Sequence, residues 1–109
     1  MTHKLLDSGA LEVVLQQFAD DRDWQKFHSP KNLAMALTGE VGELVEIFQW
    51  RTEEESKLVA QMPETAAHVR QELADVALYL FRLASVLEVD LDAAIRDKLV
   101  LNAQKYPAL

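Results

Sequence analysis

The sequence predicts an all-α fold, with a four-helix bundle-type subunit, from three observations. Three glycines and three prolines in 109 residues are few for a fold with many turns. Alanine, leucine, glutamate, glutamine and lysine, which favour helices, are abundant. Apolar side chains also recur at helical spacing, as at Leu11, Val14, Leu15 and Phe18. We therefore expect one all-helical domain over residues 1–109.

Four long helices are expected in order along the chain. The first covers residues 9–21 and precedes an aromatic-rich connector, residues 22–28. Ser29 and Pro30 open the second, because a serine N-cap accepts a backbone N–H and a proline at the first helical position needs no donor. Pro63 opens the third helix, and Asp90 is a candidate N-cap for the fourth. The second, third and fourth helices are expected at about 30–51, 63–87 and 91–105, with a polar loop containing a helical turn between the second and third.

The third predicted helix is apolar almost all the way round over residues 76–81. A helix without a polar face has to be buried on every side, and four short helices cannot easily enclose one of their number. We therefore expect an obligate homo-oligomer, with a tetramer favoured over a dimer. The alternative is burial on three sides within one subunit.

Charge and composition exclude several classes of protein. The formal net charge of −7 and a pI near 4.8 argue against binding to a nucleic-acid polymer. The absence of cysteine excludes disulfides and thiolate metal sites. Because no apolar stretch is long enough to span a membrane and the amino terminus lacks a signal-peptide pattern, we expect a cytoplasmic protein.

Four acidic residues interrupt the apolar faces of the second and third helices. Glu40 and Glu43 lie about 60° apart on the helical wheel, among the leucines that should face the core. Glu72 and Asp75 repeat this spacing on the third helix. Because burying unpaired carboxylates costs several kcal/mol, the pattern indicates a cation site.

An oxygen-only cluster contributed by facing helices is the kind of site that Mg²⁺ prefers, with Mn²⁺ as a possible substitute. Such a site typically receives phosphate oxygens. The alternative interpretation places the acids in buried salt bridges with nearby basic residues, namely Arg70, Arg82, Lys98 or Arg96.

Two further features lie close to the acids in the sequence. Aromatic rings before and at the end of the second helix could stack on a nucleobase, although a core role is more common for each ring alone. Gly39 and Gly42 each weaken the helix by about 1 kcal/mol relative to alanine. They suggest a close approach by another helix or by a ligand.

Glu40-Val41-Gly42-Glu43 and Glu72-Leu73-Ala74-Asp75 form an ExxE pair followed by an ExxD pair. With this arrangement the chain resembles the all-α nucleoside triphosphate pyrophosphohydrolases, the MazG-like superfamily. The resemblance extends from about Phe18 to Pro107. The segments that look like the dCTP pyrophosphatase branch are Arg22-Asp23-Trp24, Phe27-His28, Pro30-Lys31-Asn32-Leu33, Phe48-Gln49-Trp50 and Asn102 to Pro107.

The resemblance implies hydrolysis of dCTP, or of a modified dCTP, between the α- and β-phosphates to a monophosphate and pyrophosphate. It also implies Mg²⁺ on the four catalytic acids, Glu40, Glu43, Glu72 and Asp75. The residues implied to bind the base and sugar are Trp24, His28, Trp50 and Tyr79. Those implied to reach the phosphates, from the same or a neighbouring subunit, are Lys98, Asn102, Lys105 and Tyr106.

One position departs from the pattern, because Leu15 stands where close relatives carry a histidine. This leaves selectivity for cytosine open, and a broader nucleoside triphosphate or dUTP pyrophosphatase is the alternative enzyme. A non-catalytic helical interaction module is the alternative from another class. For the hydrolysis we expect in-line attack by water, with Glu43 as the favoured base.

Overall fold

The computed structural model describes residues 3–109, and all of the regular structure in that range is helical. The predicted all-α class is therefore confirmed. The helices are α1 (Gly9–Asp21), the short 3₁₀ helix η1 (Gln25–Phe27), α2 (Pro30–Phe48), α3 (Glu53–Ser56), α4 (Ala66–Val86) and α5 (Leu91–Lys105).

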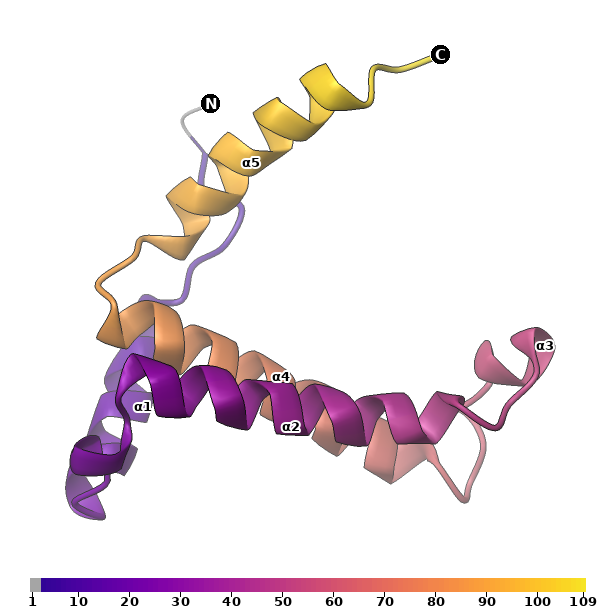
Figure 1. Cartoon of the computed structure of the whole chain (residues 1–109), viewed down its shortest axis with the longest axis horizontal. Helices are drawn as coiled ribbons and strands as arrows, with labels where there is room; N and C mark the ends of the chain where they lie inside the picture. Colours follow the sequence, from indigo (N-terminus) through magenta and orange to yellow (C-terminus); the bar gives the residue numbers. More distant parts are fainter. Residues whose placement is uncertain (1–2) are drawn as a thin grey trace.

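Helices α2 and α4 lie side by side and run in opposite directions, with α1 packed against α4 at one end (Figure 1). A small core joins α2 and α4 near the other end. It contains Ile47, Val59 and Val69, with Leu44, Phe48 and Met62 packed around them. The facing surfaces of α2 and α4 are therefore the place where inward side chains from the two helices can meet.

The helix starts follow from local capping. The Ser29 side chain accepts the Asn32 backbone N–H at 3.1 Å, and Pro30 occupies the first turn of α2. The Asp90 side chain accepts the Ala93 N–H at 3.0 Å and begins α5, as predicted. Thr52 and Glu55 form a reciprocal capping box at α3, the helical turn expected in the polar loop.

Helices α1 and α4 end in the same way. Asp23 and Glu88 adopt positive φ angles of 54° and 57°, and the next residue of each donates its N–H back into the helix. In α1 this bond joins Trp24 N to the Ala19 carbonyl at 2.9 Å. The left-handed residue turns the chain sharply, so Asp23 determines where Trp24 lies relative to α1.

Two predicted boundaries were wrong by about one turn. Helix α2 ends at Phe48 instead of Arg51, and α4 begins at Ala66 instead of Pro63. The backbone N–H groups of Thr65 and Ala66 both bond to the Met62 carbonyl, while the buried Thr65 hydroxyl donates to the Val59 carbonyl at 2.6 Å. These bonds hold residues 62–65 in a turn, so the helix starts only after it.

Helix α5 projects away from α2 and α4, with the amino-terminal segment running beside it (Figure 1). The buried Asp92 carboxylate accepts the N–H groups of Leu5 and Leu6 at 2.7 and 3.0 Å and attaches this segment to α5. Within one chain α5 therefore does not close the expected four-helix bundle. Its apolar residues Leu99, Val100 and Leu101 are consecutive, so they point around the helix and cannot form one buried face.

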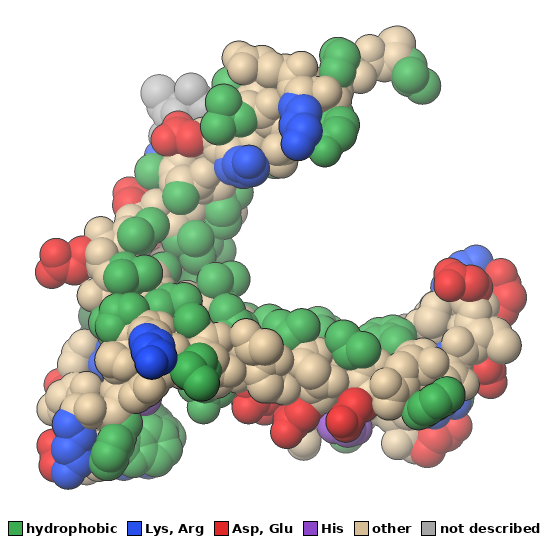
Figure 2. Space-filling view, viewed as in Figure 1, with side chains coloured by type: hydrophobic (Ala, Val, Ile, Leu, Met, Phe, Trp, Pro, Cys, Tyr) green, Lys and Arg blue, Asp and Glu red, His purple; other side chains and the backbone are tan. Residues whose placement is uncertain are grey.

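Apolar side chains line the concave side of the molecule between α5 and the α2–α4 layer, whereas acidic side chains gather on the opposite side of α2 and α4 (Figure 2). Within residues 3–109, no helix has both the length and the apolar character that crossing a membrane requires.

Candidate functional site

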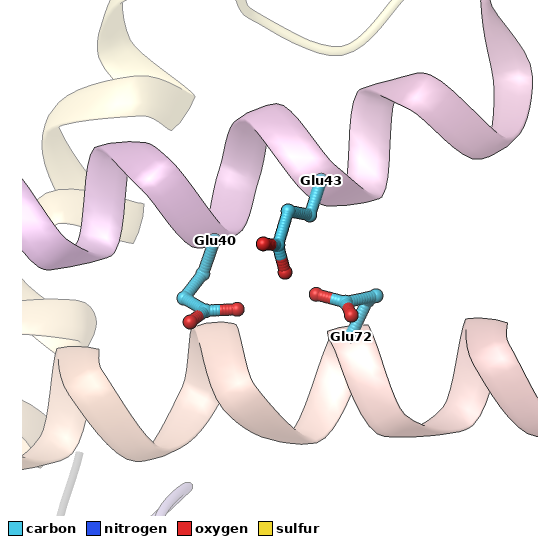
Figure 3. Close-up of side chains that lie close together, drawn as sticks. All are labelled: Glu40, Glu43 and Glu72. Atoms are coloured by element: carbon cyan, nitrogen blue, oxygen red, sulfur yellow. The ribbon is translucent and has the colours of Figure 1, made fainter.

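Three carboxylates from the two central helices point toward one another. Glu40 and Glu43 come from α2, and Glu72 comes from α4 directly opposite (Figure 3). Each residue offers one oxygen, and these oxygens all lie within 4.8 Å of one another. We call Glu40, Glu43 and Glu72 the acidic triad. The spacing that placed acids on the apolar faces of both helices thus brings these three together.

The members of the triad differ in exposure to solvent. Glu72 is buried, with 7% of its surface exposed, Glu40 is half-buried and Glu43 is exposed. The Oε2 atoms of Glu40 and Glu72 are shielded from solvent and have no hydrogen-bond partner within the described chain. Buried acceptors without partners are unfavourable, and a bound cation would satisfy both.

The electrostatics of the triad point the same way. The pKa of Glu40 is raised from 4.5 to about 7, first by burial and then by the negative charges of Glu43, Asp75 and Glu72. Without a cation, the site therefore favours a proton on Glu40 near neutral pH. A divalent cation would replace that proton and compensate several carboxylates at once.

Asp75, the fourth predicted acid, lies on α4 three residues beyond Glu72 and is half-buried. Among residues 3–109 the close group of oxygens does not include it. Its charge nevertheless contributes to the raised pKa of Glu40, and its side chain lines a neighbouring cavity. Asp75 is thus the residue that lies between the triad and that cavity.

His68 is a member of this region that the sequence interpretation missed. Its Nε2 atom lies 3.4 Å from Oε1 of Glu72, one helical turn away on α4. The sequence could have indicated this contact, because residues four positions apart on a helix are neighbours.

The alternative interpretation placed the four acids in buried salt bridges with nearby basic residues. Two of the arginines named for it have other partners in the structure: Arg82 donates to His28 and Gln16, and Arg96 donates to Asp92.

A cavity of about 180 Å³ lies beside Asp75. Three residues that the resemblance assigns to base binding, Trp24, His28 and Tyr79, contribute to its lining, and the centroids of the Trp24 and His28 rings are 6.2 Å apart. Leu15, Phe18 and Leu78 make the rest of the lining apolar, and the buried Arg82 is also present. A small cavity with aromatic walls and a few polar groups has the character of a ligand site.

The other predicted substrate residues lie elsewhere in a single chain. Trp50 follows the end of α2, is 88% exposed, and lines a different hollow together with His68 and Glu55. The residues expected to reach the phosphates are all on α5 or just after it, where that helix projects from the layer (Figure 1): Lys98, Asn102, Lys105 and Tyr106. Sequence spacing could not show this separation, because it depends on the direction that α5 takes.

Gly39 and Gly42 do not accommodate a close neighbour within the chain. A Cβ atom built on either residue would meet nothing within 4 Å. The expected close approach by another helix or by a ligand is therefore not made within the single chain and stays a prediction for a ligand or for a helix of a second copy.

These features define the class of protein. It is an α-helical protein in which two antiparallel helices hold an acidic centre that is compatible with a divalent metal ion, next to an aromatic cavity.

The comparisons with known proteins agree with this description. Residues 36–109 match the model of the MazG-like family, and the chain belongs to that family. It is 47% identical to human dCTP pyrophosphatase 1 over 92 residues, which is 84% of this chain and 54% of the human protein. The bovine protein of the same name is 46% identical over 91 residues. The chain spans about half the length of the curated relatives that it matches.

A solved structure covers nearly the whole chain. The crystal structure of a pyrophosphatase from Archaeoglobus fulgidus superimposes with a TM-score of 0.86 at 38% identity, over 99% of each chain. The fold of the chain is thus shared over nearly its whole length, α5 included, with that pyrophosphatase.

Proposed function

We propose that the protein hydrolyses a (deoxy)nucleoside triphosphate, dCTP or a modified dCTP, between the α- and β-phosphates to a nucleoside monophosphate and pyrophosphate. The observation that carries this proposal is the position of Asp75 between the acidic triad and the aromatic cavity. A nucleotide has two matching parts joined by a sugar: a flat base, which suits the aromatic cavity, and an anionic phosphate chain, which suits a cation held by the triad. The similarity to proteins named pyrophosphatases supports the reaction.

The acidic triad and Asp75 are the residues proposed to hold Mg²⁺, with Mn²⁺ as a substitute. The donor set fits, since it consists of carboxylates and includes two buried oxygens without partners. When bound, the metal supplies positive charge that neutralises the phosphate oxygens and makes phosphorus more electrophilic.

Glu43 is proposed as the general base. It is the exposed member of the triad, so water can reach it, whereas Glu40 and Glu72 turn oxygens into the protein interior. The oxygen of a water molecule would bond to the α-phosphorus while the bond from that phosphorus to the bridging oxygen breaks. Glu43 takes the proton of the water, and pyrophosphate leaves with the bonding electrons.

Trp24, His28 and Tyr79 are proposed to bind the base, because they share the cavity next to Asp75. Stacking on an aromatic ring contributes roughly 1–3 kcal/mol per base. Trp50 and the α5 residues Lys98, Asn102, Lys105 and Tyr106 are proposed to complete the site from a neighbouring copy of the chain.

A homo-oligomer, with a tetramer favoured, is part of the proposal. Leu73 and Leu80 on α4 and Leu87, its C-cap, follow one another at intervals of seven and are all exposed in the single chain. Seven residues are close to two helical turns, so these side chains form one apolar stripe. Together with the exposed apolar residues of α5, the stripe is suited to burial against further copies.

The alternative enzyme is a broader nucleoside triphosphate or dUTP pyrophosphatase. The position of Leu15 supports this alternative, because its apolar side chain lines the cavity at the position where close relatives are expected to carry a histidine. A wall that offers no hydrogen bond there discriminates less between bases.

The proposal is tested by incubating the protein with Mg²⁺ and dCTP, 5-methyl-dCTP, dUTP or dATP and separating the products by chromatography. Release of pyrophosphate together with dCMP supports the proposal, and similar turnover of all four supports the broader enzyme. Binding of nucleotide without product would instead indicate a non-catalytic interaction module.

A further inference from the structure

Arg82 on α4 has an unusual environment for an arginine. It is only 5% exposed, yet the partners that the structure shows for it are neutral groups. Its Nε–H donates to Nδ1 of His28 at 3.0 Å, and its Nη1 donates to Oε1 of Gln16 at 2.9 Å. Buried arginines are usually paired with a carboxylate, so these two neutral partners call for an explanation.

A carboxylate is present in the same cavity. Asp75 precedes Arg82 by seven residues, which places both on one side of α4, and both line the aromatic cavity. No ion pair within 4.0 Å joins them in the described part of the chain, and Arg82 is instead directed to α1 and to the connector.

The contact with Arg82 determines where the His28 ring carries its proton. Arginine has only donors, so Nδ1 of His28 must accept and cannot carry a hydrogen. The remaining ring proton is then on Nε2, at the opposite edge of the imidazole. Burial and, secondarily, the positive charge of Arg82 lower the pKa of His28, which keeps the ring neutral.

His28 lies where this donor can serve a ligand. It lines the 180 Å³ cavity with Trp24 and Tyr79, and it also lines the adjoining hollow that includes Phe27 and Asn32. Leu15, Phe18 and Leu78 line the same cavity with apolar side chains that offer a ligand no hydrogen bond, whereas the imidazole of His28 can offer one. A nucleobase offers carbonyl oxygens or ring nitrogens as acceptors on its edge, which match an N–H donor.

We propose that Arg82, held in place by Gln16, is a positioning residue that fixes His28 as a neutral Nε2–H donor for an acceptor atom of the nucleobase. The identity of the ligand as a nucleotide rests on the function proposed above. The tautomer of His28 and its dependence on Arg82 do not rest on that function. Neither residue takes part in bond breaking, so the effect is on base binding and on the choice of base.

The first test is the tautomer itself. The chain has three histidines, so the ring nitrogens of ¹⁵N-histidine-labelled protein can be assigned by NMR with a His28→Gln variant. We expect the His28 ring to carry its proton on Nε2 in the native protein and to become a mixture of tautomers in Arg82→Met. A proton on Nδ1 in the native protein, or an unchanged ring in Arg82→Met, would overturn the proposal.

The second test measures binding without hydrolysis, by calorimetric titration with dCMP. Because one neutral hydrogen bond contributes about 0.5–1.5 kcal/mol, Arg82→Met should bind dCMP about 2- to 13-fold more weakly. For the triphosphate, KM should rise by a similar factor while kcat changes little. Arg70→Met, an exposed arginine on the same helix, is the matched control and should behave as the native protein.

Gln16→Leu is the second variant in case Arg82→Met does not fold. Gln16 is exposed, so its replacement removes one anchor of Arg82 with little effect on the core. A smaller loss of dCMP affinity, together with a partial change of the His28 tautomer, is expected. Native affinity in both folded variants, or failure of the native protein to bind dCMP, would overturn the role in base binding.

The two proposals fail in different ways. If no triphosphate is hydrolysed but His28 changes tautomer and dCMP affinity falls, the positioning role stands and the proposed reaction is wrong. If triphosphates are hydrolysed but Arg82→Met retains the native tautomer and KM, the reaction stands and the positioning role is wrong.

Discussion

Glu40 on α2 and Glu72 on α4 each bury an Oε2 atom that has no hydrogen-bond partner within residues 3–109, although their carboxylates approach within 4.8 Å. Two acids in this relationship repel each other when both are charged. The site is therefore unfavourable when empty at high pH and becomes favourable when a cation or a proton is bound. Metal binding and stability should consequently be coupled.

Replacing Glu72 should change metal binding and stability in opposite directions. We expect Glu72→Gln to weaken Mg²⁺ binding at least tenfold, because a charged ligand is lost from the buried side of the triad. The metal-free variant should be more stable than the native protein at pH 8, by about 1 kcal/mol, because like charges are removed. Calorimetric Mg²⁺ titration and urea unfolding measure the two effects.

Glu53→Gln is the control for that experiment. Glu53 is an exposed acid at the start of α3 and is not in the triad, so neither quantity should change. Native Mg²⁺ affinity in Glu72→Gln would show that the triad is not the metal site.

Glu43→Gln should lose turnover more than it loses metal affinity. Because Glu43 is exposed and is proposed to accept the proton of the attacking water, we expect pyrophosphate release to fall by about 100-fold or more. Its Mg²⁺ affinity should fall less than that of Glu72→Gln, which replaces a buried ligand. Turnover within tenfold of the native rate would exclude Glu43 as the base.

The stability of the metal-free protein should depend on pH because of Glu40. Its pKa is about 7 in the folded chain and near 4.5 when it is unperturbed, so between these values the folded state binds more protons than the unfolded state. Stability should therefore fall as pH rises from 4.5 to 7 and level off above that range. Since Mg²⁺ competes with this proton, its stabilising effect should be larger at pH 8 than at pH 5.5.

Thermal unfolding at both pH values, with Mg²⁺ and with a chelator, measures this linkage. An Mg²⁺-induced rise in Tm of the same size at pH 5.5 and pH 8 would contradict the assignment of the raised pKa to a metal ligand.

Glu88→Gly should stabilise the protein. Glu88 has a φ of 57° at the end of α4, a conformation that strains a residue with a Cβ atom and that glycine adopts freely. The expected gain is about 0.5–1 kcal/mol, measured by urea unfolding. Glu64→Gly is the matched control, because this exposed glutamate precedes α4 without a positive φ, and glycine there should be neutral or destabilising. A loss of stability in Glu88→Gly would be inconsistent with the helix end described above.

The apolar stripe on α4 should control assembly. We expect sedimentation to give the mass of a tetramer for the native protein and a smaller species for Leu80→Glu, because a charge would be placed in an apolar contact. Ala74→Glu, an exposed position off the stripe, should leave the mass unchanged. A native protein that sediments as a monomer would remove the basis for completing the site with residues of a second copy.

The sequence by itself determined the features that depend on neighbours along the chain. Helical periodicity predicted that Glu40, Glu43 and Glu72 face inward, because the direction of a side chain on a helix follows from about 100° per residue. Ser29, Pro30 and Asp90 predicted helix starts for the same reason, since a cap bonds to a residue only two or three positions away.

Only the tertiary structure decided which distant groups meet. The bond from Arg82 to His28 spans 54 positions and the bond to Gln16 spans 66, so no local pattern predicts either. The attachment of the amino-terminal segment to α5 depends likewise on the bonds from the backbone of Leu5 and Leu6 to Asp92, which lies more than 80 positions away. Such contacts are set by how helices pack and which rotamers fit between them, and these depend on the whole chain at once.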